Sequence, residues 1–341
     1  MVLAEGWTQW TLLLAIGISA VAEVSAQDES AAELKYFKSV RTIVFDDPDV
    51  PPIAAIDHMD VDASGRLLVT DELGEQVLLF DSKGILLASL DPRGCHPGFT
   101  FLPVGAMFGG DEYIFLRNAG PWGYLFTSEG ACMEDVDPEF VPSTFMDIDP
   151  TGTLFGVQEK PFWEVRRMSP SGKLQETFPV MEPRYPNASS RYADGGVVAD
   201  GTHIYFAWAP EPAVLKYTLA GEFVRKIQKR SRYFKPPDAD LPAEVSPELF
   251  AALRRWTGTI TRSVLELDDH IIMVQYLDYQ RGTGYQVFSK DGTLIAEELG
   301  IGGRFFIHGR DGFAYGIIQP DLDEKGELPN PYLIVYKFSP P

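Results

Sequence analysis

The chain has 341 residues, of which 45% are hydrophobic and 23% charged, a composition that excludes a disordered chain and a multi-span membrane protein. It carries 29 Lys and Arg against 49 Asp and Glu, and the resulting net charge of −20 disfavours binding to the phosphate backbone of nucleic acids. Its 31 glycines, 26 prolines and 12% aromatic residues supply turns and strand-forming side chains, which favours an all-β fold.

The first element along the chain is an apolar run at residues 12–22, which is too short to span a bilayer. Residues 24–26 follow it with the small-x-small pattern of a signal-peptide cleavage site. Against this, residues 1–10 contain Glu5 and neither Lys nor Arg. We predict a signal peptide over residues 1–26 and a periplasmic or secreted protein with no integral membrane span, with an uncleaved anchor or a misassigned start as the alternatives.

Turn signals then recur along the chain at about the period of 40 to 50 residues that marks propeller blades. Each unit has one tight turn after its inner strand and a second turn before its outer strand. The first series lies at residues 64–65, 110–111, 151–152, 200–201, 268–269 and 311–312. The second series lies at residues 82–84, 128–130, 171–172, 220–221 and 291–292. With four strands per unit, this pattern predicts a single six-bladed β-propeller domain over residues 27–341.

The last unit is one strand short, because the chain ends soon after the strand expected at residues 332–338. A β-rich run at residues 39–45 precedes the first complete unit and has no partner there. We predict that this N-terminal strand pairs beside residues 332–338, because that pairing closes the ring and removes an exposed edge.

One interval in the second series is about 25 residues longer than the repeat, which places an insertion at about residues 229–260, between blades 4 and 5. Residues 246–248 read Ser-Pro-Glu, a helix start, and apolar residues at helical spacing follow up to Trp256. We predict one short amphipathic helix there, over the face of the ring that carries the loops between blades. From Arg225 to Arg262 the chain has five more basic than acidic residues, which could attract an anionic ligand or partner or could be a solvated face.

Two stretches of the first unit, residues 65–71 and 76–84, resemble an NHL repeat, and residues 94–103 resemble the linker between blades of such proteins. The chain as a whole is similar to bacterial exported six-bladed propellers with NHL-like repeats. The resemblance implies a fold and not a chemistry, because propellers include lyases, lactonases and pure binding modules.

Candidate ligand-binding residues lie on the loop face of the ring, where the inner strands begin, where the second strands end and, for Trp256, in the insertion. They are His58, Arg117, Glu159, Trp208, Arg262, Arg304 and Trp256. The charged side chains could hold an anionic small molecule or an acidic sugar against the aromatic rings. The alternative is that they are solvated loop residues with some ion pairs between blades.

Metal and redox chemistry have little support in the sequence. The five histidines fall in different units with no metal-ligand spacing, so we expect no metal site and no cofactor, with a Ca²⁺ site of oxygen ligands as the alternative. Cys95 and Cys132 are the only cysteines. We expect two unpaired thiols, with a disulfide as the alternative, because the repeat places one cysteine in a loop between blades and the other near the opposite end of an outer strand.

These observations predict an exported, monomeric propeller that binds a ligand or a partner protein through its loop face, the ligand being anionic or carbohydrate-like. The alternative is an enzyme, either a metal-assisted lactonase or a polysaccharide lyase, that uses the same face.

Overall fold

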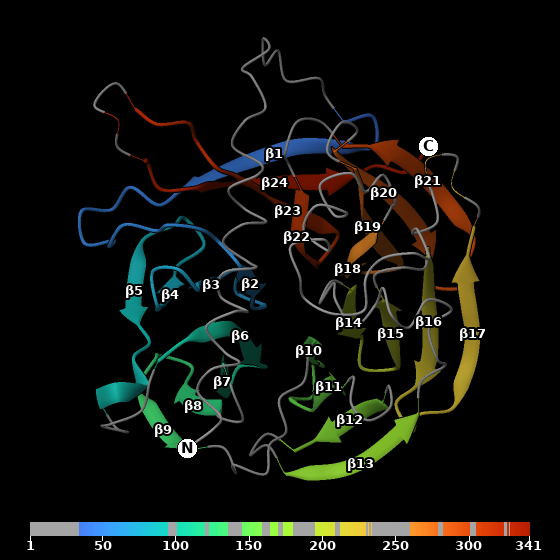
Figure 1. Cartoon of the computed structure of the whole chain (residues 1–341), viewed down its shortest axis with the longest axis horizontal. Helices are drawn as coiled ribbons and strands as arrows, with labels where there is room; N and C mark the ends of the chain where they lie inside the picture. Colours follow the sequence, from blue (N-terminus) through green and yellow to red (C-terminus); the bar gives the residue numbers. More distant parts are fainter. Residues whose placement is uncertain are drawn as a thin grey trace, which may run out of the picture.

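The computed structural model describes residues 34–94, 101–119, 123–135, 145–158, 164–169, 173–179, 195–208, 212–229, 231, 233, 260–278, 282–300, 305–323, 326 and 328–341. In these residues the chain forms six antiparallel four-stranded sheets around a central axis (Figure 1). The predicted all-β, six-bladed propeller is therefore confirmed. No helix of the described residues has the length and hydropathy needed to cross a membrane.

The first three blades follow one another along the chain. Blade 1 consists of β2 (His58–Val61), β3 (Leu67–Asp71), β4 (Gln76–Phe80) and β5 (Leu86–Ser89). Blade 2 consists of β6 (Pro103–Gly109), β7 (Tyr113–Asn118), β8 (Gly123–Thr127) and β9 (Cys132–Asp135). Blade 3 consists of β10 (Phe145–Ile148), β11 (Leu154–Gln158), β12 (Glu164–Met168) and β13 (Leu174–Pro179).

Blades 4 and 5 repeat this order, and blade 6 takes its outer strand from the other end of the chain. Blade 4 consists of β14 (Gly195–Ala199), β15 (His203–Trp208), β16 (Ala213–Thr218) and β17 (Phe223–Gln228). Blade 5 consists of β18 (Ile260–Leu267), β19 (His270–Asp278), β20 (Gly282–Ser289) and β21 (Leu294–Leu299). Blade 6 consists of β22 (Phe305–Arg310), β23 (Phe313–Ile318), β24 (Tyr332–Phe338) and β1 (Phe37–Val44).

The ring is closed by β1, which pairs antiparallel with β24 from Phe37 opposite Phe338 to Val44 opposite Tyr332. The two strands lie side by side at the ring's edge, although they come from opposite ends of the chain (Figure 1). This is the closure that the sequence predicts, within a few residues of the expected boundaries.

Apolar side chains fill the contacts between neighbouring blades, with one buried cluster at each of the six contacts. Between blades 6 and 1, for example, Val61 and Phe80 pack with Tyr315 and Leu333. Because side chains of a strand alternate between its two faces, each blade contributes to the clusters on both of its sides. The ring as a whole is thus held by packing between successive blades.

The turns before the outer strands contain glycine for two physical reasons. Gly84 has φ of +91°, a left-handed conformation that other residues rarely adopt. In addition, a Cβ at residue 84 would stand 2.6 Å from the carbonyl oxygen of Val44, because β1 of the preceding blade ends against this turn. Gly130 has the same φ and meets Ala88 and Leu90 at the end of β5. Each of these two turns therefore packs against the outer strand of the preceding blade.

The expectation that the two cysteines are unpaired is wrong. Cys132 is disulfide-bonded and, because Cys95 is the other cysteine of the chain, Cys95 is its partner. Cys95 itself lies outside the described residues. The expectation failed because the end of β5 lies against the turn that precedes β9: a Cβ at Gly130 would be 2.9 Å from that of Ala88. The segment after β5 therefore begins close to Cys132.

The insertion expected at about residues 229–260, with its short helix, lies almost entirely outside the described residues, as does the predicted signal peptide. Within the described part of the chain the only helix is η1 (Pro92–Gly94), a single 3-10 turn after β5.

Candidate functional site

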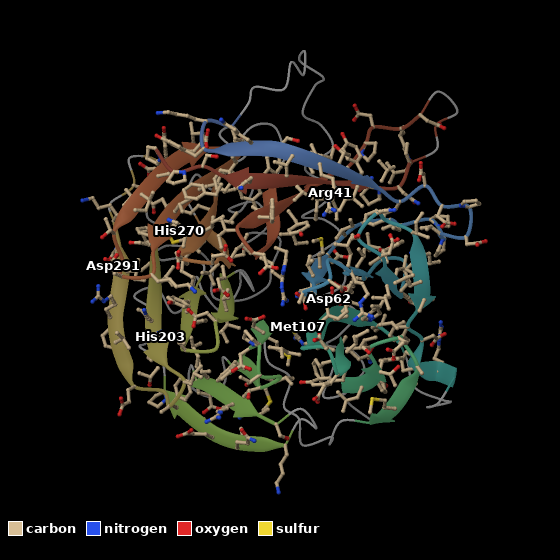
Figure 2. All side chains as sticks on the ribbon, turned by 180° about the vertical axis from the view of Figure 1, so that it is seen from behind. Arg41, Asp62, Met107, His203, His270 and Asp291 are labelled. Atoms are coloured by element: carbon tan, nitrogen blue, oxygen red, sulfur yellow. The ribbon has the colours of Figure 1, made fainter. Side chains whose placement is uncertain are left out.

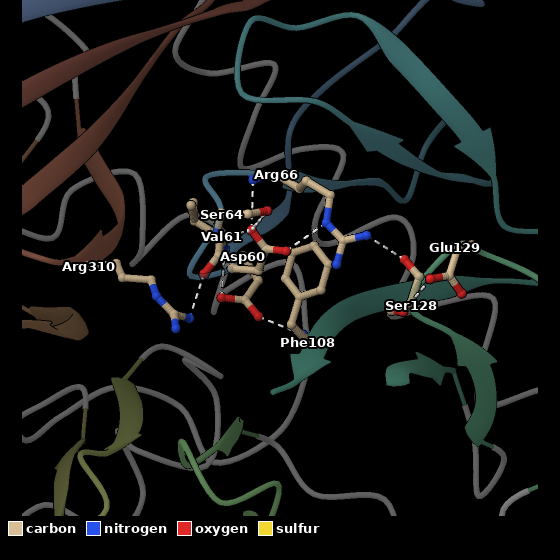
Figure 3. Close-up of polar contacts among 9 residues, drawn as sticks. Asp60, Val61, Ser64, Arg66, Phe108, Ser128, Glu129 and Arg310 are labelled. Atoms are coloured by element: carbon tan, nitrogen blue, oxygen red, sulfur yellow. Dashed lines mark hydrogen bonds and ion pairs between the residues drawn. The ribbon is translucent and has the colours of Figure 1, made fainter. Parts of the chain in front are cut away.

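Strand β2 places two polar side chains near the axis of the ring. Met59 and Val61 enter the apolar cluster against blade 6, so His58 and Asp60 lie on the opposite face of the strand. The Asp60 carboxylate accepts hydrogen bonds from the N–H of Phe108 in β6 (2.7 Å) and from the N–H of Val61 (2.8 Å). Asp60 therefore joins the inner strands of blades 1 and 2 (Figure 3).

Blade 6 brings two more polar side chains to the same place. The Nε2 atom of His308 lies 3.5 Å from Oδ1 of Asp60. The Arg310 guanidinium donates a hydrogen bond of 2.6 Å to the carbonyl of Val61 (Figure 3). The side chains of His308 and Asp60 are 19% and 14% exposed, although the Nε2 atom of His308 is itself buried. The seam between the first and last blades thus carries an imidazole, a carboxylate and a guanidinium near the axis.

His58 and Arg117 both lie at the loop-face end of the seam between blades 1 and 2. The imidazole of His58 packs on Gly105 of β6, where a Cβ would be 3.4 Å from its Cγ. Arg117 of β7 is paired directly opposite Gly105, and opposed residues of antiparallel strands point to the same face of the sheet. The Arg117 guanidinium therefore projects toward blade 1, on the side where His58 lies.

Burial dominates the electrostatics of these groups. It lowers the pKa of His58 to about 4 against the opposing effect of Asp60, and it lowers the pKa of His308 to about 3, with Arg310 adding to the effect. Both imidazoles are therefore neutral near pH 7. Burial also raises the pKa of Asp60, although its N–H donors oppose the rise. Burial lowers the pKa of Arg117 to about 10, although the charge of Glu72 opposes this shift. Arg117 therefore keeps its positive charge near pH 7.

A second carboxylate, two blades further along the ring, repeats the role of Asp60. Asp147 of β10 accepts a hydrogen bond of 2.7 Å from the N–H of Ala199 in β14, as Asp60 does from Phe108. Burial raises the pKa of Asp147 well above its ordinary value, and the charges of Asp60 and Glu266 raise it further. Carboxylates of blades 1, 3 and 5 thus influence one another near the axis.

An ion network that includes Glu266 lies at the contact between blades 4 and 5. The Lys290 ammonium lies 2.8 Å from a carboxylate oxygen of Asp200 and 2.6 Å from one of Glu266. Tyr205 donates a hydrogen bond of 3.3 Å to Asp200, and Lys216 donates one of 2.9 Å to the carbonyl of Lys290. Every described member of this network contacts another, so the network serves the packing of blades 4 and 5. The candidate site is therefore the set of polar side chains near the axis described above: His58, Asp60, Arg117 and His308.

Several polar residues of the loop face hold loops in place. Asn118 accepts a hydrogen bond from the N–H of Leu102, and Asp57 accepts one from the N–H of Glu72. Asp71 accepts hydrogen bonds from the N–H groups of Ala54 and Gly74 and from the side chain of Gln76. These side chains fix the loops around His58 and Arg117.

Of the predicted binding residues, the structure brings together His58 and Arg117. Trp208 ends β15 and Arg262 lies in β18. Glu159, Arg304 and Trp256 lie outside the described residues, so their place in a site stays a prediction. No group of three or more His, Cys, Asp or Glu side chains that could hold a metal ion occurs in the described part of the chain.

Sequence reasoning missed Asp60, Asp147 and His308. A signal for the two aspartates is present in the repeats, since residues 60–62 and 147–149 both read Asp-x-Asp. In each pair the first aspartate bonds to the next blade, and the second caps the turn: Asp62 accepts from the N–H groups of Ser64 and Arg66. For His308 no sequence signal exists, because its contact joins the first and last blades.

Comparison with known proteins supports the fold and leaves the chemistry open. No family model and no curated protein sequence matches the chain. Among solved structures, the chain is similar to a protein of Bacteroides fragilis that is named as exported (12% identity, TM-score 0.63, covering 90% of this chain and 95% of that one). A DUF4221 family member from Bacteroides vulgatus has 11% identity and a TM-score of 0.64, over 89% of this chain and 98% of that one.

A virginiamycin B lyase from Staphylococcus aureus is similar at 11% identity and a TM-score of 0.51, over 89% of each chain. At these identities the likenesses show the propeller fold alone. The NHL-like character expected from the sequence stays a prediction, since no family model matches.

Proposed function

We propose that the protein is an exported binding propeller whose loop face binds an anionic, carbohydrate-like ligand at the His58 and Arg117 side chains. The observation that carries the proposal is their placement: a charged guanidinium and a neutral imidazole lie together where β2 begins and β7 ends. A guanidinium forms paired hydrogen bonds with a carboxylate, and a neutral imidazole both donates and accepts hydrogen bonds with hydroxyl groups.

Export is supported by two independent features. The chain begins with an apolar run and a cleavage pattern, and the disulfide of Cys132 is of the kind that persists in oxidising compartments. The similar Bacteroides fragilis protein is also named as exported. A periplasmic or secreted location agrees with all three.

The binding proposal is tested by calorimetric titration of the full chain with oligogalacturonate, an acidic sugar, and with a neutral maltooligosaccharide of the same length. We expect the acidic sugar to bind and Arg117→Gln or His58→Gln to weaken its binding by about tenfold or more. Arg93→Gln is the matched control, because Arg93 is an exposed arginine after β5 that pairs with Asp91. Equal binding of both sugars, or an equal loss in the Arg93 variant, would contradict the proposal.

A lyase or lactonase is the second candidate, favoured by the approach of His308 to Asp60. A bound substrate that raised the low pKa of His308 could use its imidazole as a proton acceptor, with the adjacent carboxylate orienting the ring. The similar protein named as a virginiamycin B lyase resembles this chain in fold alone. Incubation with polygalacturonate and with a small lactone tests this candidate: accumulation of unsaturated or ring-opened product that His308→Gln abolishes would support it.

A further inference from the structure

The rim between blades 6 and 1 exposes an apolar stripe along two edge strands. Val40 and Val44 of β1 are 52% and 46% exposed, and Ile85 and Leu87 at the start of β5 are 47% and 52% exposed. The alternate residues point inward: Ile43 and Leu86 pack into the apolar cluster between these blades. We call Val40, Val44, Ile85 and Leu87 the rim stripe.

The backbone of β1 contacts the turn that precedes β5. The carbonyl of Val44 lies against Gly84, the residue before Ile85, and Arg41 donates a hydrogen bond of 3.2 Å to the carbonyl of Ser82 in the same turn. Figure 2 shows Arg41 at the rim of the ring. The end of β1 therefore meets the turn before β5, while Val44 and Ile85 point away from the apolar cluster that Ile43 and Leu86 share. This stripe holds a third of the exposed large hydrophobic side chains of the described residues.

Both strands are also sheet edges. In the order β1-β24-β23-β22, β1 pairs on one side only, and β5 is likewise the last strand of blade 1. An edge strand presents backbone N–H and C=O groups that an extended segment of another protein can pair with. Other outer strands share this edge position, so edge character alone does not distinguish the rim stripe.

The basic residues around the rim stripe indicate which kind of partner would bind there. Exposed Lys38 and Arg41 flank Val40, and exposed Lys83 precedes Ile85. Residues 35–44 and 82–89 contain no Asp or Glu, although the whole chain has a net charge of −20. A second copy that paired β1 with β1 would oppose these cations to each other, which is unfavourable. An extended segment that alternates aliphatic and acidic residues satisfies both the apolar side chains and the cations.

We propose that the rim stripe is a docking site where an extended, acidic and aliphatic segment of a partner protein adds to the edge strand β1. This site lies on the outer rim and is independent of the loop face, so either proposal can fail without the other. The rim stripe would be the surface through which the protein acts as a scaffold.

The test measures binding of a fluorescent peptide of alternating Val and Glu to the full-length protein, by anisotropy, beside a peptide with Lys in place of each Glu. We expect saturable binding of the Glu peptide only, and a loss of about tenfold or more for Val44→Glu or Lys38→Glu. Leu174→Glu is the matched control, because Leu174 is 49% exposed on β13, the edge strand of blade 3. Circular dichroism verifies that each variant is folded.

Four results would overturn the proposal. They are the absence of Glu-peptide binding up to millimolar concentration, equal binding of the Lys peptide, an equal loss in Leu174→Glu, and a dimer in light scattering that Val44→Glu dissociates. The last result would assign the stripe to a second copy of the chain. Binding of anionic lipid vesicles that Val44→Glu abolishes, without peptide binding, would assign it to a membrane surface.

Discussion

The carbonyl oxygen of Val44 lies so close to Gly84 that a Cβ on residue 84 would stand 2.6 Å from it. This contact joins the strand that closes the ring to the first complete blade. It also explains why the turn contains glycine: its φ of +91° requires a residue without a Cβ, and the neighbouring carbonyl leaves no room for one.

Gly84→Ala should therefore destabilise the protein by more than the usual cost of a positive φ. We expect a loss of about 2 to 4 kcal/mol in the free energy of unfolding, from backbone strain and from displacement of β1. Gly282→Ala separates the two causes, because Gly282 has φ of +69° and no atom within 4 Å of an added Cβ. Its cost should be about 1 kcal/mol, measured by urea unfolding. Equal losses in both variants would show that the contact with Val44 contributes nothing.

The disulfide of Cys132 should stabilise the ring at the contact of blades 1 and 2. Cross-linking limits the conformations of the unfolded chain, and for a loop of this length the effect is ~2–4 kcal/mol. Cys132→Ser should lower the midpoint of unfolding, and the reduced wild-type protein should unfold at the same midpoint as this variant. A reduced protein as stable as the oxidised one would contradict the prediction.

The fold could be predicted from the sequence because its signals are local. A left-handed turn needs glycine whatever lies around it, so the spacing of the turn residues gave the number of blades and the position of the strands. The pairing of β1 with β24 followed from the need to cover an edge.

The site could be predicted only in part, because its contacts depend on how blades pack. The placement of His58 and Arg117 on one face was predicted because both lie at strand ends, and their role in binding stays a prediction. His308 and Asp60 are 248 positions apart in the chain and come together only because the ring closes. No local sequence pattern predicts that contact. The cysteine pair was missed for the same reason: the stagger of adjacent blades, not the repeat itself, brings the end of β5 to the turn before β9.

Acid should destabilise the protein through the two buried histidines. The folded-state pKa values of His58 and His308 are lowered to about 4 and about 3 from 6.5, so the unfolded chain takes up these protons first. The stability they contribute is present above pH 6.5 and is lost as the pH falls toward 4. Asp60 and Asp147 act in the opposite direction, because their raised pKa values let the folded state take up protons earlier.

His308→Gln isolates one histidine from this balance. Between about pH 7 and about pH 5, the wild-type protein should lose about 2 kcal/mol more of its free energy of unfolding than this variant does. Urea unfolding at both pH values measures the difference, with His270→Gln on β19 as the control outside the cluster. The prediction fails if the His308 variant loses as much stability as the wild-type protein.

Lys290 should stabilise the contact between blades 4 and 5, where the chain has its long insertion. Burial lowers the pKa of Lys290, but hydrogen bonds to Asp200 and Glu266 outweigh it and raise this pKa. The hydrogen bond from Lys290 also helps to keep Asp200 ionised, although the Asp200 side chain is only 2% exposed. Lys290→Met leaves that carboxylate buried without its cation, so we expect a loss of about 2 to 3 kcal/mol in urea unfolding. Arg93→Gln breaks an exposed surface ion pair with Asp91 and should lower the free energy of unfolding by less than about 1 kcal/mol. If the two variants were equally stable, the interblade network would be only a surface arrangement, and apolar packing alone would hold blades 4 and 5 together.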